Sequence, residues 1–188
     1  MVEWANSALR PLWLDTAARP EPRAAVDASV SVDLLVIGGG FTGLWTALRA
    51  LERDPAATVL LVEADRIAEH ATGRNGGFCE ASLTHGEANG MARWPEEYET
   101  LHTLGLRNLD EIEQTIARHG IDCGFVRGGV LTVATREHEI AALEPDQPGF
   151  LDSVAVRRML DSPTYLAGRH HSGECALVDP ARLAWGLA

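Results

Sequence analysis

The residues with the clearest chemical meaning form a glycine-rich turn, Gly38-Gly39-Gly40-Phe41-Thr42-Gly43, directly after the run 32–37, which is apolar except for Asp33. Gly38, Gly40 and Gly43 occupy the three fixed positions of GxGxxG. The first glycine permits a tight turn, the second lets the backbone approach a pyrophosphate, and the third lets a helix pack against a strand. The turn therefore predicts a phosphate-binding site for a dinucleotide, with the N–H of Thr42 among the donors at a helix N-terminus.

A carboxylate at the expected separation along the sequence supports this interpretation. Apolar residues recur at helical spacing from Leu44 to Leu51, and Asp54-Pro55 ends that helix. A second apolar strand over 58–62 leads to Glu63, which lies 20 residues after Gly43. At this separation in a strand–helix–strand unit, an acidic side chain accepts hydrogen bonds from a ribose. We therefore place Glu63 and its neighbour Ala64 beside the ribose.

A second glycine-rich segment over 71–78 bears on which dinucleotide is bound. The carboxylate of Glu63 disfavours a 2′-phosphate, which leaves NAD and FAD as candidates. In this segment Arg74 can pair with phosphate oxygens, and Asn75 can both donate and accept hydrogen bonds. Gly76-Gly77 allows the backbone to approach a flat ring, and we include Thr72 of the same loop in the predicted site. Such a loop can enclose more phosphate and ring than NAD requires, although an ordinary exposed turn is the alternative.

Three segments together resemble the opening of a known family: GGGFTGL at 38–44, LLVEADRI at 60–67 and ATGRNGGF at 71–78. They are similar to the FAD-dependent oxidoreductases of the D-amino-acid-oxidase-like (DAO) superfamily, and especially to its gamma-glutamylputrescine-oxidoreductase-like members. The similarity continues nearly to the end of the chain through three further segments, 119–125, 129–134 and 177–183.

The resemblance implies FAD as the cofactor and oxidation of a C–N bond in a small amine or amino acid, with dioxygen reoxidising the flavin. Members of the family are considerably longer, so the resemblance also implies that the chain corresponds to an N-terminal portion. No catalytic residue is assigned. An NAD-dependent dehydrogenase and a non-catalytic dinucleotide-binding fragment stay open as alternatives.

The predicted fold class is α/β, with an incomplete Rossmann-like FAD-binding domain followed by the start of a mixed α+β substrate domain. Within this second region we expect a helix over 96–119, a hairpin around Gly128-Gly129 and a short helix capped by Thr135. Along the chain we expect first an extended arm over 1–30, which packs through Trp4, Trp13 and Leu14 or is mobile at its tip. A βαβ core with the second loop follows over 31–81. A mixed region over 82–176 and a return helix over 177–188 complete the chain.

Composition limits the possible partners and location. The formal net charge of −11 over 188 residues argues against nucleic acid and anionic membrane partners. No apolar stretch is long enough to span a bilayer and the N-terminus lacks a signal-peptide core, so we expect a cytoplasmic protein. Neither the three separated cysteines nor His170-His171, which we expect in an exposed loop, predicts a metal site. The oligomeric state is not predicted.

Overall fold

A computed structural model of the chain describes residues 10–188, so the first nine residues of the predicted arm, Trp4 among them, lie outside the described part. The chain divides into two compact units. The first contains the chain up to Gly77 together with Glu113–Phe125 and Val178–Ala188, and the second contains Phe78–Ile112 and Val126–Leu177. Both units are therefore discontinuous in sequence, whereas the predicted domains follow the chain in order and stay predictions.

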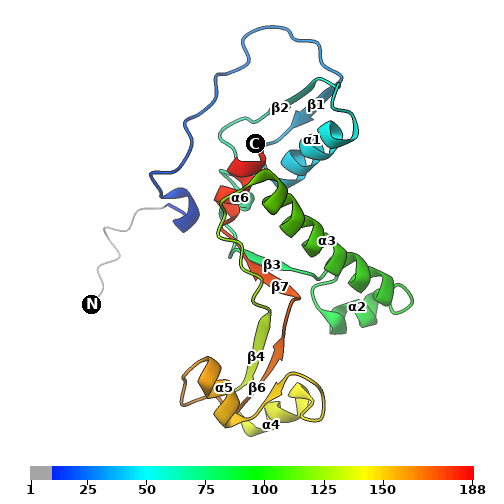
Figure 1. The fold of residues 1–188 in the computed structure, drawn as a ribbon, viewed down its shortest axis with the longest axis vertical. Coiled ribbons are helices and arrows are strands. Elements are labelled where there is room, and N and C mark those ends of the chain that lie inside the picture. The colour runs from blue at the N-terminus through cyan, green and yellow to red at the C-terminus, as the bar shows by residue number, and fades with distance from the viewer. Residues whose placement is uncertain (1–9) are drawn as a thin grey trace. The chain divides into compact units, whose positions relative to one another are not determined.

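The centre of the first unit is a strand–helix–strand element. Strand β1 (Leu34–Ile37) and strand β2 (Val59–Val62) are parallel, with Leu34 opposite Val59 and Ile37 opposite Val62. Helix α1 (Phe41–Arg53) connects them and lies beside both strands (Figure 1). Parallel neighbours require such a crossover connection, and the apolar runs of four residues suit a sheet that is covered by a helix. The predicted order of strand, helix and strand is thus present, with the two strands parallel.

Segments from both ends of the chain complete the first unit. Helix α6 (Pro180–Leu187) begins at Asp179, whose carboxylate accepts the N–H groups of Ala181 and Arg182, both at 3.0 Å. Two short 3-10 helices, η2 (Leu12–Leu14) and η3 (Ala71–Gly73), belong to the same unit. Its apolar core joins residues of α1, of the segment before η3 and of α6, namely Leu44, Ala68 and Ala184, with Phe41, Leu61, Ile67 and Leu187 packed against them.

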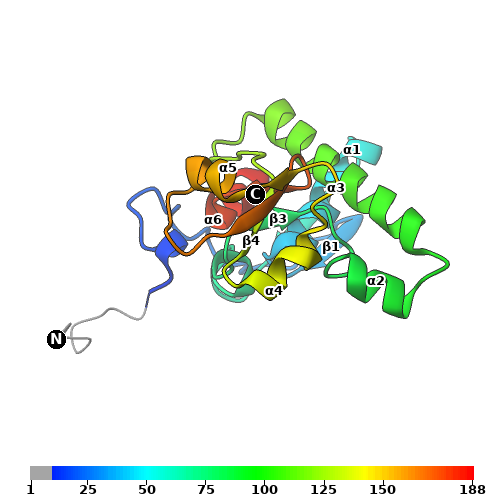
Figure 2. The same ribbon diagram turned by 90° about the horizontal axis from the view of Figure 1, so that it is seen from below.

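The second unit contains two antiparallel sheets. One pairs β3 (Phe78–Glu80) with β7 (Cys175–Leu177), and the other has the order β4-β6-β5. Short helices accompany the three-stranded sheet, and two views show α4 and α5 near its strands (Figures 1 and 2). The remaining elements of this unit are β4 (Val130–Ala134), β5 (Phe150–Leu151), β6 (Ala167–His171), α2 (Glu87–Arg93), α4 (Glu137–Ile140), η4 (Ala141–Leu143) and α5 (Ser153–Met159).

Helix α3 (Tyr98–His119) contributes to both units and confirms the helix predicted over 96–119. Its C-terminus is followed by Gly120 at φ +62°, a conformation that glycine adopts without steric cost. No helix within residues 10–188 is both long enough and apolar enough to cross a membrane.

Three local predictions are wrong. The segment around Gly128 is not a hairpin, because Val126 pairs with Leu177 and the following strand β4 pairs with β6. His170 and His171 lie in strand β6 rather than in a loop. The short helix α4 begins after Arg136 instead of Thr135, since the carboxylate of Glu139 accepts the N–H groups of both residues, at 3.1 and 2.8 Å.

Candidate dinucleotide site

The two parallel strands of the first unit bring the glycine turn and Glu63 together. Ile37 and Val62, the last residues of β1 and β2, are direct partners, so the residues that follow them leave the sheet at the same edge. The N–H of Gly38 donates to the carbonyl oxygen of Val62 at 2.8 Å. Ligands of open α/β sheets bind at this carboxyl edge of the strands.

The glycines at the ends of the turn have different steric roles. Gly38 has φ +114°, a conformation that residues with a Cβ rarely adopt. At Gly43 a Cβ would collide with the carbonyl oxygen of Gly38 and lie 3.3 Å from the side chain of Val36. The first glycine therefore makes the tight turn, and the third allows α1 to pack against β1.

The N-terminus of α1 offers free hydrogen-bond donors. Its N-cap, Gly40, has no side chain to satisfy them. The N–H of Phe41 donates to Oγ1 of Thr72 at 3.2 Å, and within residues 10–188 no acceptor is recorded for the backbone N–H groups of Thr42 and Gly43. Unpaired N–H groups and the positive end of the helix dipole make this terminus suitable for an anion such as a phosphate.

The carboxylate of Glu63 is fixed by backbone donors. One oxygen accepts the N–H of Gly39 at 2.6 Å and the other accepts the N–H of Asp65 at 3.0 Å. These bonds, first that from Gly39, lower the pKa of Glu63 from its ordinary value, so the side chain is charged at neutral pH. A carboxylate has about four lone-pair positions, which leaves capacity for a ligand hydroxyl group.

A cavity of about 340 Å³ lies between the end of β1, the start of α1 and Thr72. Thr46 belongs to it and was missed by the sequence analysis, although its position four residues after Thr42 places it on the same face of α1. Its hydroxyl group donates to the carbonyl oxygen of Thr42 at 2.7 Å. The residues around the cavity are Val36, Ile37, Gly38, Gly40, Phe41, Thr42, Gly43, Thr46 and Thr72.

The predicted residues of the second glycine-rich loop are divided between two roles. Thr72 reaches the cavity, whereas the side chains of Arg74 and Asn75 bind within their own loop region. Nε of Arg74 donates to the carbonyl oxygen of Glu69 at 2.7 Å, and Nδ2 of Asn75 donates to that of Thr72 at 2.7 Å. Neither Arg74 nor the segment 75–77 lines this cavity, so their assignment to the cofactor stays a prediction.

Trp13 is a further residue that the sequence analysis had not connected with this loop. Its indole N–H donates to the carbonyl oxygen of Asn75 at 2.8 Å. Gly77 adopts φ +76°, and a Cβ there would lie 3.1 Å from the ring of Trp13 and 2.6 Å from the carbonyl oxygen of Val178. The described part of the arm therefore packs against the second loop, and only a glycine fits beside the indole ring.

Together, the parallel strands, the glycine turn, the helix N-terminus and the charged Glu63 define a dinucleotide-binding βαβ unit. Residues 33–188 match the family described as FAD dependent oxidoreductase (DAO), and the chain belongs to this family. FAD is the cofactor of the family, which favours FAD over the NAD alternative.

Individual relatives agree with this assignment. The chain is 31% identical to the gamma-glutamylputrescine oxidoreductase of Escherichia coli over 92% of its length, and it spans 42% of that relative. Its fold matches glycine oxidase from Bacillus cereus with a TM-score of 0.61 at 20% identity, covering 84% of this chain and 43% of that structure. L-amino acid deaminase from Proteus myxofaciens gives a TM-score of 0.61 at 18% identity, covering 85% and 36%. The chain thus spans less than half the length of these relatives.

Proposed function

We propose that the chain provides the FAD-holding part of an oxidoreductase that oxidises the C–N bond of a small amine or amino acid and uses dioxygen as the electron acceptor. Family membership supports the reaction class, and the names of the relatives, a gamma-glutamylputrescine oxidoreductase and a glycine oxidase, support the substrate class. The observation that carries the proposal is the cavity at the N-terminus of α1, with free N–H groups on one side and Glu63 at the adjoining strand end.

The residues of this cavity suit the charged and polar parts of the cofactor. The N–H groups of Thr42 and Gly43 would donate to the pyrophosphate, whose negative charge the helix dipole stabilises. Gly40 leaves room for it, because a Cβ at this position would lie 3.1 Å from Oγ1 of Thr72. Glu63 would accept a ribose hydroxyl group with the lone pairs that Gly39 and Asp65 do not use.

The residues of this site would bind and orient the cofactor. When bound, FAD would supply the redox chemistry, a two-electron oxidation of the C–N bond with dioxygen as the final electron acceptor. The side chains of Thr72 and Glu63 hold the glycine turn through the N–H groups of Phe41 and Gly39. Their contribution is a site that is already shaped before the cofactor binds.

The test is to measure the absorption spectrum and melting temperature of the purified chain with FAD and, separately, with NAD. Two results would support the proposal. One is a flavin absorption band at about 450 nm that stays with the protein after gel filtration. The other is a melting temperature that is raised by FAD but not by NAD. Stabilisation by NAD alone would contradict it.

A pair of glycine variants makes this test specific for the cavity. Gly40→Leu should abolish stabilisation by FAD, because Gly40 has extended backbone angles that leucine tolerates while the new side chain fills the cavity beside Thr72. Gly128→Leu is the matched control, since no atom lies within 4 Å of a Cβ at that position. Equal FAD binding by both variants would show that the cofactor lies elsewhere.

A further inference from the structure

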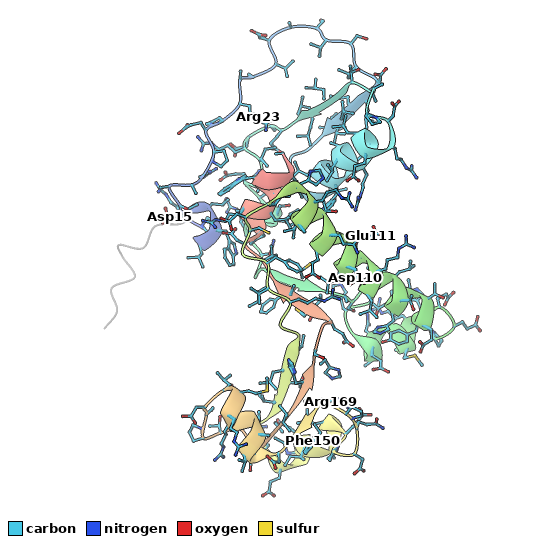
Figure 3. The ribbon with its side chains drawn as sticks, viewed as in Figure 1. Asp15, Arg23, Asp110, Glu111, Phe150 and Arg169 are labelled. Atoms are coloured by element: carbon cyan, nitrogen blue, oxygen red, sulfur yellow. The ribbon has the colours of Figure 1, made fainter. Side chains whose placement is uncertain are left out.

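A second and larger cavity lies in the first unit, apart from the glycine turn. Its volume is about 600 Å³, and it is lined by seven residues of the arm between Arg10 and Arg19, together with Arg66, Glu69 and Arg74. None of the glycines 38–43 lines it. Figure 3 labels Asp15, which lies on its rim at the end of η2.

The cavity is positively charged within a strongly acidic chain. Four arginines line it, Arg10, Arg19, Arg66 and Arg74, against two carboxylates, Asp15 and Glu69. Its formal charge is therefore +2, while the whole chain carries −11. A local excess of guanidinium groups around a concave surface attracts and concentrates small anions.

Internal ion pairs hold part of this arrangement in place. Glu69 forms ion pairs with both Arg19 and Arg74, and Arg19 and Glu69 are only 23% and 18% exposed in their side chains. Because these arginines are already ordered, a ligand would lose little binding energy in immobilising them. A guanidinium group has five N–H donors, so Arg19 and Arg74 retain donors that Glu69 does not use.

Arg66 differs from the other three arginines. Arg10 forms an ion pair with Asp15 at 3.2 Å, whereas within residues 10–188 no hydrogen bond or ion pair is recorded for the side chain of Arg66. Arg66 is half-buried and lines the cavity, so its charge is available to a ligand. Guanidinium groups match the planar or tetrahedral oxygens of carboxylates and phosphates.

Apart from Thr16, the remaining residues that line the cavity are apolar. Pro11, Leu14 and Ala17 come from the arm, and Leu14 is 5% exposed. A volume of about 600 Å³ is within the usual range for sites that hold an organic molecule and is much larger than an inorganic ion requires. Charge, size and apolar walls together define the ligand class.

We propose that this cavity binds a small organic dianion, with its charges on one phosphate group or on two carboxylates. This site is additional to the cofactor site and does not depend on it. Arg66 supplies the unpaired positive charge, and the pair of Arg19 and Arg74 around Glu69 supplies fixed donors.

The experiment is calorimetric titration of the chain with glycerol 3-phosphate and with succinate, using neutral glycerol as the blank, each without FAD and with excess FAD. Binding of either dianion under both conditions would support the proposal and identify the charged group. Failure of both dianions to bind would overturn the proposal. Loss of dianion binding in the presence of FAD would also overturn it, because the dianion and FAD would then occupy the same site. If the chain does not bind FAD, the titration without FAD still decides the proposal.

Charge-removing variants localise the binding. Arg66→Gln should lower the affinity for the dianion by about tenfold, as expected for the loss of one charge-assisted hydrogen bond. Arg53→Gln, an exposed arginine at the end of α1, is the matched control and should leave the affinity unchanged. Arg10→Gln, at a side chain that is 70% exposed, tests the same cavity if Arg66→Gln lowers the melting temperature. Equal weakening by Arg53→Gln would overturn the proposal, because it would indicate attraction to the overall charge only.

Discussion

Replacement of Glu63 by glutamine tests how its carboxylate stabilises the glycine turn. In the wild-type chain both carboxylate oxygens accept backbone N–H groups, from Gly39 at 2.6 Å and from Asp65 at 3.0 Å. Glutamine retains only one acceptor oxygen, and its NH2 group would face an N–H donor. Glu63→Gln therefore removes one charge-assisted bond and leaves one backbone donor without a partner.

The expected loss of stability is modest but measurable. A hydrogen bond to a charged group contributes about 1.5–3 kcal/mol, and the half-buried position of Glu63 favours the lower end, about 1.5 kcal/mol. For a chain of this size such a loss lowers the melting temperature by about 3–6 °C. Calorimetry or fluorescence melting at pH 7 can resolve this difference.

The pH dependence provides a second and independent readout. The pKa of Glu63 is lowered in the folded chain, so its charge stabilises the fold above the ordinary value of 4.5, and this contribution disappears as the pH falls through the lower folded value. The difference between wild type and Glu63→Gln should therefore be largest near neutral pH and shrink below 4.5. A difference that stays constant down to pH 3 would refute the reasoning.

A second glutamate separates the effect on the fold from the effect on the cofactor site. The carboxylate of Glu139 also accepts two backbone N–H groups, from Thr135 and Arg136, and its pKa is also lowered, first by the bond from Thr135. Glu139→Gln should lower stability without changing the rise in melting temperature that FAD produces, whereas Glu63→Gln should reduce that rise. An unchanged FAD response in Glu63→Gln would remove this residue from the cofactor site.

Other variants test the packing around the site. Gly43→Ala should lower the melting temperature by an amount that corresponds to about 1–3 kcal/mol, because its Cβ would collide with the carbonyl oxygen of Gly38; stability equal to wild type would contradict this packing. Asp179→Ala should cost about 1 kcal/mol in thermal unfolding, since the carboxylate accepts two N–H groups at the start of α6, and an unchanged melting temperature would refute the cap. Trp13→Phe should release the arm, detected as faster proteolysis near residues 15–30, because the indole bond to Asn75 is lost; cleavage at the wild-type rate would argue against that anchor.

The parts of the structure that were predictable from sequence are those fixed by neighbours in the chain. The strands β1 and β2 are short apolar runs, the turn at Gly38 needs a glycine, and the helix of 22 residues has a clear apolar spacing. Each of these signals is local, and the two strands and the long helix are present with boundaries that differ from the predicted ones by at most two residues.

The parts that were not predictable depend on partners distant in sequence. Strand β3 reads Phe-Cys-Glu and strand β7 reads Cys-Ala-Leu, and three residues are too few to show an alternating pattern. Each becomes a strand because it pairs with the other, almost a hundred residues away. The false hairpin at Gly128 has the same cause, because β4 finds its partner in β6 rather than in the segment before it.

The side chains of the second loop show that residue type alone does not predict which group a donor binds. Arg74 and Asn75 have the chemistry to bind a cofactor, and residue type alone suggested that they do so. In the structure, Arg74 donates to the carbonyl oxygen of Glu69 and Asn75 donates to that of Thr72, so the same groups shape the loop. Residue type identifies a donor, but only the fold shows whether its acceptor is already within the protein.

Glu63 illustrates the opposite case, in which one residue has a structural role in addition to the predicted binding role. Its spacing from Gly43 predicts a contact with a ribose, yet in the structure the carboxylate also fixes the N–H of Gly39 in the glycine turn. An acidic residue at this position therefore orders the glycine turn before any cofactor binds. Preorganisation of this kind reduces the conformational cost of binding. The charge of Glu63 should therefore increase FAD affinity, although Gly39, the turn residue that it holds, does not line the cavity.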